Sequence, residues 1–72
     1  MTLFRRTTGM TLNQYLTRYR VATAQRLLAT TELSVTEIAL HSGFGSQSRF
    51  FEAFAAACGM PPSRYRRQAR GG

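Results

Sequence analysis

The chain has 72 residues, 43% of them hydrophobic, which is enough for one small domain with a compact core. The single cysteine rules out an internal disulfide, and with only one histidine besides it a zinc site is not expected. Three glutamates and no aspartate leave too few carboxylates for a carboxylate-pair or Ser-His-Asp enzyme. No apolar run approaches the ~18 residues of a membrane span. Ten arginines give a net charge of +7, which indicates a polyanionic partner, with nucleic acid ahead of a membrane surface.

The first half of the chain predicts one long helix. Gly9 ends a short segment, residues 1–8, that is too short to be stable as an isolated helix. Thr11 and Gln14 have the spacing of a capping box, and a helix is predicted over 12–30 because apolar residues then recur every three or four positions. The residues expected on its core face are Leu12, Tyr15, Leu16, Tyr19, Ala24, Leu27 and Leu28.

Two shorter helices are predicted next. Ser34 and Glu37 form a second capping box, which opens a helix over 35–42, and Gly43 is placed to end it in the left-handed conformation. Ser46 is a natural N-cap for a helix over 47–58. The residues of that helix expected to face the core are Phe50, Ala53, Phe54 and Ala57.

The C-terminal end predicts a fourth helix. Gly59 stops the preceding helix, and Pro62 suits the first turn of a helix over 62–69. The last residues are expected to fray. No segment alternates with period two, so the predicted fold class is all-α.

Residues 35–54 predict a helix-turn-helix. Ala39 is small where the second helix is expected to cross, and Gly43 supplies the turn. Phe44 is expected between the helices, while Phe50 and Phe54 hold the second helix in the core and free its opposite face. In such motifs the second helix enters the major groove of DNA.

The stretch GFGSQSRFFEAFAAACGMPPSRYR resembles the C-terminal signature of AraC/XylS-type transcriptional regulators. The matching residues are Gly43, Phe44, Ser48, Phe50, Phe54, Gly59, Pro62, Tyr65 and Arg66. Upstream, Tyr15-Leu16, Arg20, Ala24 and Leu27-Leu28 resemble the family's linker helix, and Ile38-Ala39 its following helix. The resemblance covers nearly the whole chain.

The resemblance implies a domain of two helix-turn-helix units joined by the long helix. Phe4 and Gly9 fit the end of the first unit's recognition helix, so we expect either a late start at Met1 or a piece of a longer protein, with the effector-binding domain absent from this chain. The expected divisions are the end of a truncated first recognition helix (1–8), a linker helix (9–33), the helix-turn-helix (34–68) and a frayed tail (69–72).

The resemblance and the chemistry of the exposed helix face together name candidate base-reading residues. Gln47 could pair with adenine, Arg49 with guanine or a phosphate, and Ser48 with either. Phe51 could touch a thymine methyl group or a hydrophobic neighbour. Glu52 stands where the family often has Arg; it could accept from cytosine N4 but would repel phosphates.

Backbone contacts are expected mainly from the ends of the chain. Residues 31–60 are net −2, whereas all the remaining charge is arginine. The candidate backbone residues are Arg18, Ser46, Arg64, Arg66 and Arg67. Arg20, among apolar neighbours, is expected to be structural and to pair with a Glu or a carbonyl group.

The predicted function is therefore that of a sequence-specific DNA-binding regulator in the bacterial cytoplasm. Its expected partner is double-stranded DNA, with RNA polymerase as a further one, no membrane and no cofactor. One alternative is a remnant that self-associates through exposed residues such as Leu3 and Phe4. The other is part of an Ada-type alkylation-repair methyltransferase, which would need a reactive cysteine; Cys58, at a helix end before Gly59, does not fit, so no enzyme is expected.

Overall fold

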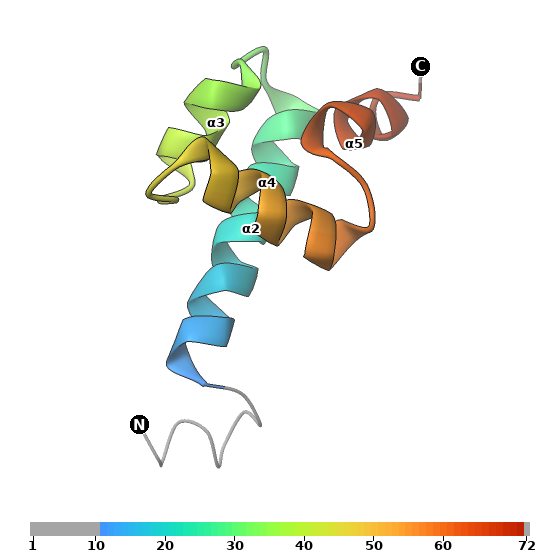
Figure 1. Ribbon diagram of the computed structural model, residues 1–72. Coiled ribbons are helices and arrows are strands. Elements are labelled where there is room, and N and C mark those ends of the chain that lie inside the picture. The colour runs from blue at the N-terminus through green and yellow to red at the C-terminus, as the bar shows by residue number, and fades with distance from the viewer. Residues whose placement is uncertain (1–10, 72) are drawn as a thin grey trace.

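The computed structural model describes residues 11–71, which form helices and no strands, as expected for an all-α fold. The helices are α2 (Leu12–Thr30), α3 (Val35–His41), α4 (Gln47–Cys58) and α5 (Pro62–Ala69). The long helix α2 is the axis of the molecule, and the other three gather around its C-terminal half (Figure 1). The segment 1–8, expected to end a first recognition helix, lies outside the described residues.

The helix starts follow the capping residues of the sequence. The Thr11 hydroxyl accepts from the Gln14 amide N–H at 3.1 Å, and Gln14 Oε1 accepts from the Thr11 N–H at 3.0 Å. The Ser34–Glu37 pair repeats this reciprocal pattern, and the Ser46 hydroxyl accepts from the Arg49 N–H at 3.2 Å. Each cap satisfies donors that the first helical turn leaves without partners, so these boundaries are fixed locally.

Gly43 and Gly59 end α3 and α4 as predicted. Their φ angles are +87° and +73°, a region that side chains with a Cβ rarely adopt. Gly43 follows Ser42, the C-cap of α3, and lets the chain turn sharply toward α4. The two helices are thereby held as a helix-turn-helix.

The core is built from the C-terminal half of α2 and the inner faces of α3 and α4. Its buried residues are Val21, Ala24, Leu28, Ile38, Ala39, Phe50 and Phe54. The Phe50 and Phe54 rings are 5.7 Å apart, and Phe54 meets Tyr65 of α5 edge-on at 5.5 Å. The prediction that Phe50 and Phe54 anchor α4 is confirmed, since both are 0% exposed.

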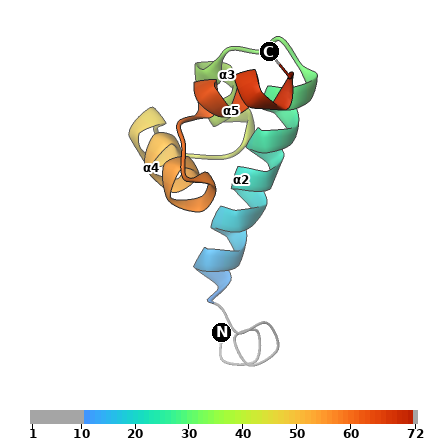
Figure 2. The ribbon, with the colours of Figure 1, turned by 90° about the vertical axis from the view of Figure 1, so that its right-hand side faces the viewer.

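The core face predicted for the start of α2 is wrong for its two tyrosines, whereas Leu12 and Leu16 are partly buried. Tyr15 and Tyr19 are 44% and 65% exposed. The reason is visible from two sides: the first turns of α2 project beyond the other helices, and the fully buried residues of α2 begin at Val21 (Figures 1 and 2). Ala57, also predicted to face the core, is exposed on the side of α4 that looks toward α2.

Two arginines near the end of the chain fasten α5 to the end of α2. Arg66 donates from Nε to the Leu28 carbonyl at 3.1 Å and from one terminal nitrogen to the carbonyls of Thr31, at 3.1 Å, and Leu33, at 2.6 Å. Arg70 donates to Glu32 Oε2 at 3.0 Å and to the Thr31 carbonyl. We call Arg66 and Arg70 the C-terminal clasp.

The C-terminal clasp supplies hydrogen-bond donors to the C-terminal end of α2. The last carbonyls of a helix have no partners within it, and they carry partial negative charge. The last turn of α2 contains no basic residue, so distant guanidinium groups supply the donors and the positive charge. Arg70, which lies in the tail expected to fray from residue 69, is held by these acceptors through its side chain.

No helix within residues 11–71 is both long and apolar enough to cross a membrane.

Candidate nucleic-acid interface

The outer face of α4 gathers all five candidate base-reading residues. Their side chains are exposed while the neighbouring Phe50 and Phe54 are buried, so one face of α4 is anchored and the other is presented to solvent. The residues presented are Gln47, Ser48, Arg49, Phe51 and Glu52. Phe51 is 42% exposed and its ring lies 5.7 Å from that of Phe50, so part of it is covered and part is available for contact.

Gln47 has a partner that the sequence did not suggest. Its side-chain Nε2 donates a hydrogen bond to the Thr36 hydroxyl of α3. Thr36 lies 11 positions earlier in the chain, and only the fold of the helix-turn-helix brings the two together. The bond orients the Gln47 amide at the start of α4 and occupies one of its donors, which leaves its carbonyl oxygen as an acceptor.

The candidate backbone arginines separate into two groups. Arg18, Arg64 and Arg67 are exposed, and the structure gives their guanidinium groups no hydrogen bond or ion pair with residues 11–71. Arg66 is half-buried and its guanidinium binds the three carbonyls described above. Arg66 is therefore reassigned from phosphate contact to the fold, because its donors already serve the end of α2.

Arg20 lacks the protein hydrogen bonds expected of it, and the C-terminal clasp makes them instead. Arg20 makes no hydrogen bond with the described residues, so the expected pairing with a Glu or a carbonyl is wrong. Its side chain packs instead against the turn: a Cβ at Gly43 would lie 3.3 Å from Arg20 Nε. The carbonyl and glutamate partners foreseen for Arg20 belong to Arg66 and Arg70.

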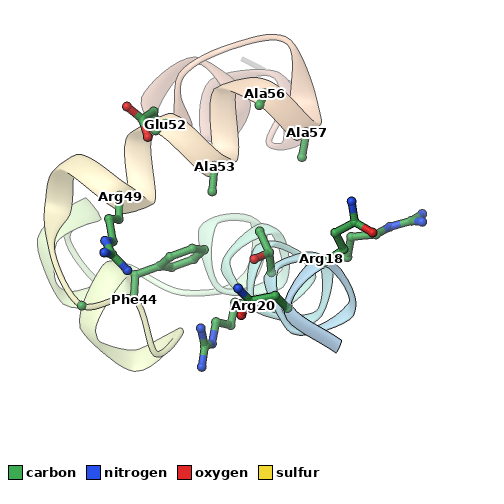
Figure 3. A pocket seen from close by; sticks show the side chains of 12 residues that line it. Arg18, Arg20, Phe44, Arg49, Glu52, Ala53, Ala56 and Ala57 are labelled. Carbon is green, nitrogen blue, oxygen red and sulfur yellow. The ribbon is translucent and has the colours of Figure 1, made fainter. Parts of the chain in front are cut away.

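A groove of about 990 Å³ separates the N-terminal half of α2 from α4. Small side chains of α4 form one wall; Figure 3 shows Ala53 and Ala57 pointing across the groove toward α2, with Phe44 between the two helices. The opposite wall carries polar side chains of α2. Arg18, Arg20 and Arg49 also line the groove, which therefore adjoins the exposed face of α4.

Cys58 lies apart from these surfaces and is chemically quiet. It is half-buried, and the Gln25 side-chain amide donates to its Sγ at 3.2 Å. Burial raises the pKa of the Cys58 thiol, although the Gln25 hydrogen bond opposes this effect. A thiol with a raised pKa is a poor nucleophile at neutral pH, so the methyl-transfer alternative gains no support from this residue.

Comparison with known proteins places these features in context. Residues 2–68 match a family model described as a helix-turn-helix domain. The chain is 40% identical to the melibiose operon regulatory protein of Escherichia coli K12 and 43% identical to the transcriptional activator RhaR of Enterobacter sp. strain 638, in each case over 93% of this chain and 22% and 24% of the relative, respectively. The chain thus spans less than a quarter of these relatives.

Among solved structures, the fold is similar to the C-terminal domain of the two-component response regulator yesN from Fusobacterium nucleatum. The TM-score is 0.85 at 34% sequence identity, covering 90% of this chain and 63% of the other.

Proposed function

Since this chain belongs to the AraC-type helix-turn-helix family of transcriptional regulators, we propose that it binds double-stranded DNA sequence-specifically and thereby regulates transcription. The observation that carries the proposal is the exposed face of α4. Buried Phe50 and Phe54 hold this helix rigidly, and its outer face presents hydrogen-bonding side chains in the region where helix-turn-helix proteins read bases.

In this proposal α4 enters the major groove with its N-terminal end leading. Arg49 would donate to guanine O6 and N7, and Glu52 would accept from cytosine N4. Gln47, with Nε2 directed to Thr36, would use its carbonyl oxygen to accept from an exocyclic amino group of adenine or cytosine. Ser48 adds a hydroxyl, and Phe51 an apolar surface for a thymine methyl group.

Affinity for the DNA backbone would come from outside the helix-turn-helix segment. Residues 31–60 are net −2, so α3 and α4 alone would not attract a polyanion. Arg18 of α2 and Arg64 and Arg67 of α5 have exposed guanidinium groups for phosphates, and Ser46 adds a hydroxyl at the start of α4.

The test is selection of preferred duplexes from a random library, followed by titration of the preferred and scrambled duplexes. Gln47→Ala should cost roughly 1–3 kcal/mol on the preferred site and relax the preference at one base pair, with little effect on the scrambled duplex. Arg26→Ala, on the exposed surface of α2, is the matched control. A wild-type chain that binds all duplexes equally would contradict sequence-specific recognition.

The relatives also suggest the direction of regulation. One carries the name transcriptional activator. We therefore propose activation, with RNA polymerase as a second partner. A reporter gene placed behind the selected site should respond to the regulator and lose that response with the Gln47→Ala variant.

Self-association is the second candidate function. Leu3 and Phe4, named for it from the sequence, lie outside the described residues, but Tyr19 is 65% exposed on the projecting part of α2 and offers apolar surface. Sedimentation over a wide range of protein concentrations distinguishes the two functions. A molecular mass that rises with protein concentration, together with no binding to any DNA duplex, would favour self-association.

A further inference from the structure

The groove between α2 and α4 has the chemistry of a phosphate-binding surface. Three arginines line it, from α2 and from the start of α4, and none of them makes a hydrogen bond or ion pair within residues 11–71. Arg66 and Arg70, by contrast, are bound to protein acceptors. Figure 3 shows their guanidinium groups spread along the edges of the groove, and guanidinium groups without protein partners are suited to an extended anionic ligand.

The remaining lining suits an extended ligand better than a small apolar one. Asn13, Gln14 and Thr17 supply amide and hydroxyl donors along the projecting half of α2. Across from them the alanines of α4 leave room for a close approach. Phe44 is the one aromatic residue of the lining, whereas pockets for small organic molecules are mostly apolar and aromatic.

The groove is also continuous with the face of α4 proposed to read bases. Arg49 belongs to both surfaces. Glu52 reaches the rim as well, but its carboxylate points away from α2 in Figure 3. A ligand that lies along α4 therefore meets the polar wall of α2 without a break.

We propose that this groove holds the sugar-phosphate backbone of the DNA strand that flanks the major groove entered by α4. The projecting half of α2 then lies along the duplex, with Arg18 and Arg20 on phosphates beyond the bases that α4 reads. This assignment rests on the proposed function and gives α2 a direct role in binding DNA. It also assigns Arg20 a ligand, in addition to its packing on the turn.

The first experiment measures how DNA affinity depends on salt. Anisotropy titrations of the full chain with the selected duplex, from 50 to 200 mM salt, compare wild type, the double variant Arg18→Ala/Arg20→Ala and the control Arg26→Ala. The plot of the logarithm of the association constant against the logarithm of the salt concentration should become shallower by about 1.8 in the double variant, since each lost phosphate contact removes about 0.9 from the magnitude of the slope. The control should keep the parental slope.

Arg20 packs on Gly43, so the double variant could lose stability. Arg18→Ala alone, at an exposed position, avoids this difficulty and should lower the slope by about 0.9. An unchanged slope in this folded single variant, with the preferred duplex still bound, overturns the groove assignment but leaves the proposed function intact. A wild-type chain that binds no duplex overturns both.

A second experiment locates the strand. Asn13→Cys and Thr30→Cys, each with Cys58→Ala, carry an iron-EDTA group at opposite ends of α2. The group at position 13 should cleave the backbone beside the selected site, and the group at position 30 should not. Equal cleavage from both positions would contradict the proposal. It would also be contradicted if calorimetry showed binding of inorganic phosphate or ATP that depends on Arg18, while the salt dependence of DNA binding did not depend on Arg18.

Discussion

At the scale of single residues, α4 shows how two neighbouring phenylalanines can have opposite roles. Phe54 is 0% exposed and contacts both Phe50 and Tyr65. Phe51 lies on the outer face and is half-exposed. The difference arises from the helical period: Phe54 is four positions from buried Phe50 and shares its face, whereas Phe51 directly follows Phe50 and lies about 100° around the helix. Phe54 therefore serves the fold, whereas Phe51 is a residue that we propose for recognition.

Phe54→Ala should therefore destabilise the chain by about 3–5 kcal/mol, because it removes the transfer free energy of the ring and leaves a cavity in a small core. At this size the variant should be largely unfolded. Thermal and urea denaturation followed by circular dichroism measure the effect. Phe51→Ala is the matched control and should change stability by less than about 1 kcal/mol; equal losses in both variants would contradict the facing of α4.

At the scale of the helices, a helix boundary set by neighbouring residues can be recognised in the sequence, whereas one set by distant residues cannot. The starts of α2, α3 and α4 depend on side chains within three positions, which is why Thr11, Ser34 and Ser46 could be recognised as caps in the sequence. The end of α2 depends on Arg66, 33 to 38 positions away. Charge and helical spacing do not distinguish that arginine from the exposed Arg67 beside it; only the family signature, which includes Arg66, does so.

Arg66→Ala and Arg67→Ala should separate the two uses of arginine on α5. Loss of Arg66 should cost about 1.5–3 kcal/mol of stability, since three half-buried carbonyls lose a charged donor. Loss of Arg67 should leave the melting temperature nearly unchanged and lower the salt slope of DNA binding by about 0.9. Melting curves and salt titrations of both variants provide the measurement; the reverse pattern would refute the reassignment of Arg66.

The cap of α3 should make stability depend on pH. Hydrogen bonds from the Ser34 backbone and side chain to Glu37 are the main cause that lowers the pKa of the Glu37 carboxyl, and nearby His41 lowers it further. A group with a lowered pKa in the folded state stabilises that state above its unfolded pKa of about 4.3, and the contribution is lost as the pH falls through the lower, folded value. Stability should thus decline below about pH 4.

Glu37→Gln keeps a hydrogen-bond acceptor but removes the titration. Its denaturation midpoint should vary less between pH 5 and pH 3 than that of wild type. Glu52→Gln is the control, because Glu52 is exposed on α4 and takes no part in a cap. Identical pH profiles for wild type and Glu37→Gln would show that the cap contributes no pH dependence.

At the scale of the whole molecule, the distribution of charge assigns different helices different parts in the proposed binding of DNA. The net −2 segment that contains α3 and α4 is flanked by arginine-rich helices. In the proposed complex the Glu52 carboxylate repels nearby phosphates while it accepts from one cytosine. Glu52→Arg should therefore raise affinity for a scrambled duplex, steepen the salt slope by up to about 1 and reduce the preference for the selected duplex. Anisotropy titrations on the preferred and scrambled duplexes measure these effects, and weaker binding to the scrambled duplex would contradict the repulsion.

The all-α class and the four helices of residues 11–71 could be predicted from the sequence because glycines, prolines and caps act locally. The exposure of Tyr15 and Tyr19 could not. Their spacing fits an apolar stripe, but which half of α2 is covered depends on where α3 to α5 pack. In the candidate interface, the face of α4 followed from helical periodicity, whereas the Gln47–Thr36 bond and the free state of Arg20 required the fold.

The C-terminal clasp also has a consequence for synthesis. The hydrogen bond from Arg66 to Leu28 spans 38 positions, so α2 acquires its C-terminal partners only after residue 66 has left the ribosome. Until then, Phe54 lacks the ring of Tyr65 that lies against it in the finished domain. A nascent chain that stalls before Pro62 would expose these apolar side chains and become a substrate for chaperones and proteases. The core around Phe54 and the end of α2 therefore cannot be completed until α5 has been synthesised.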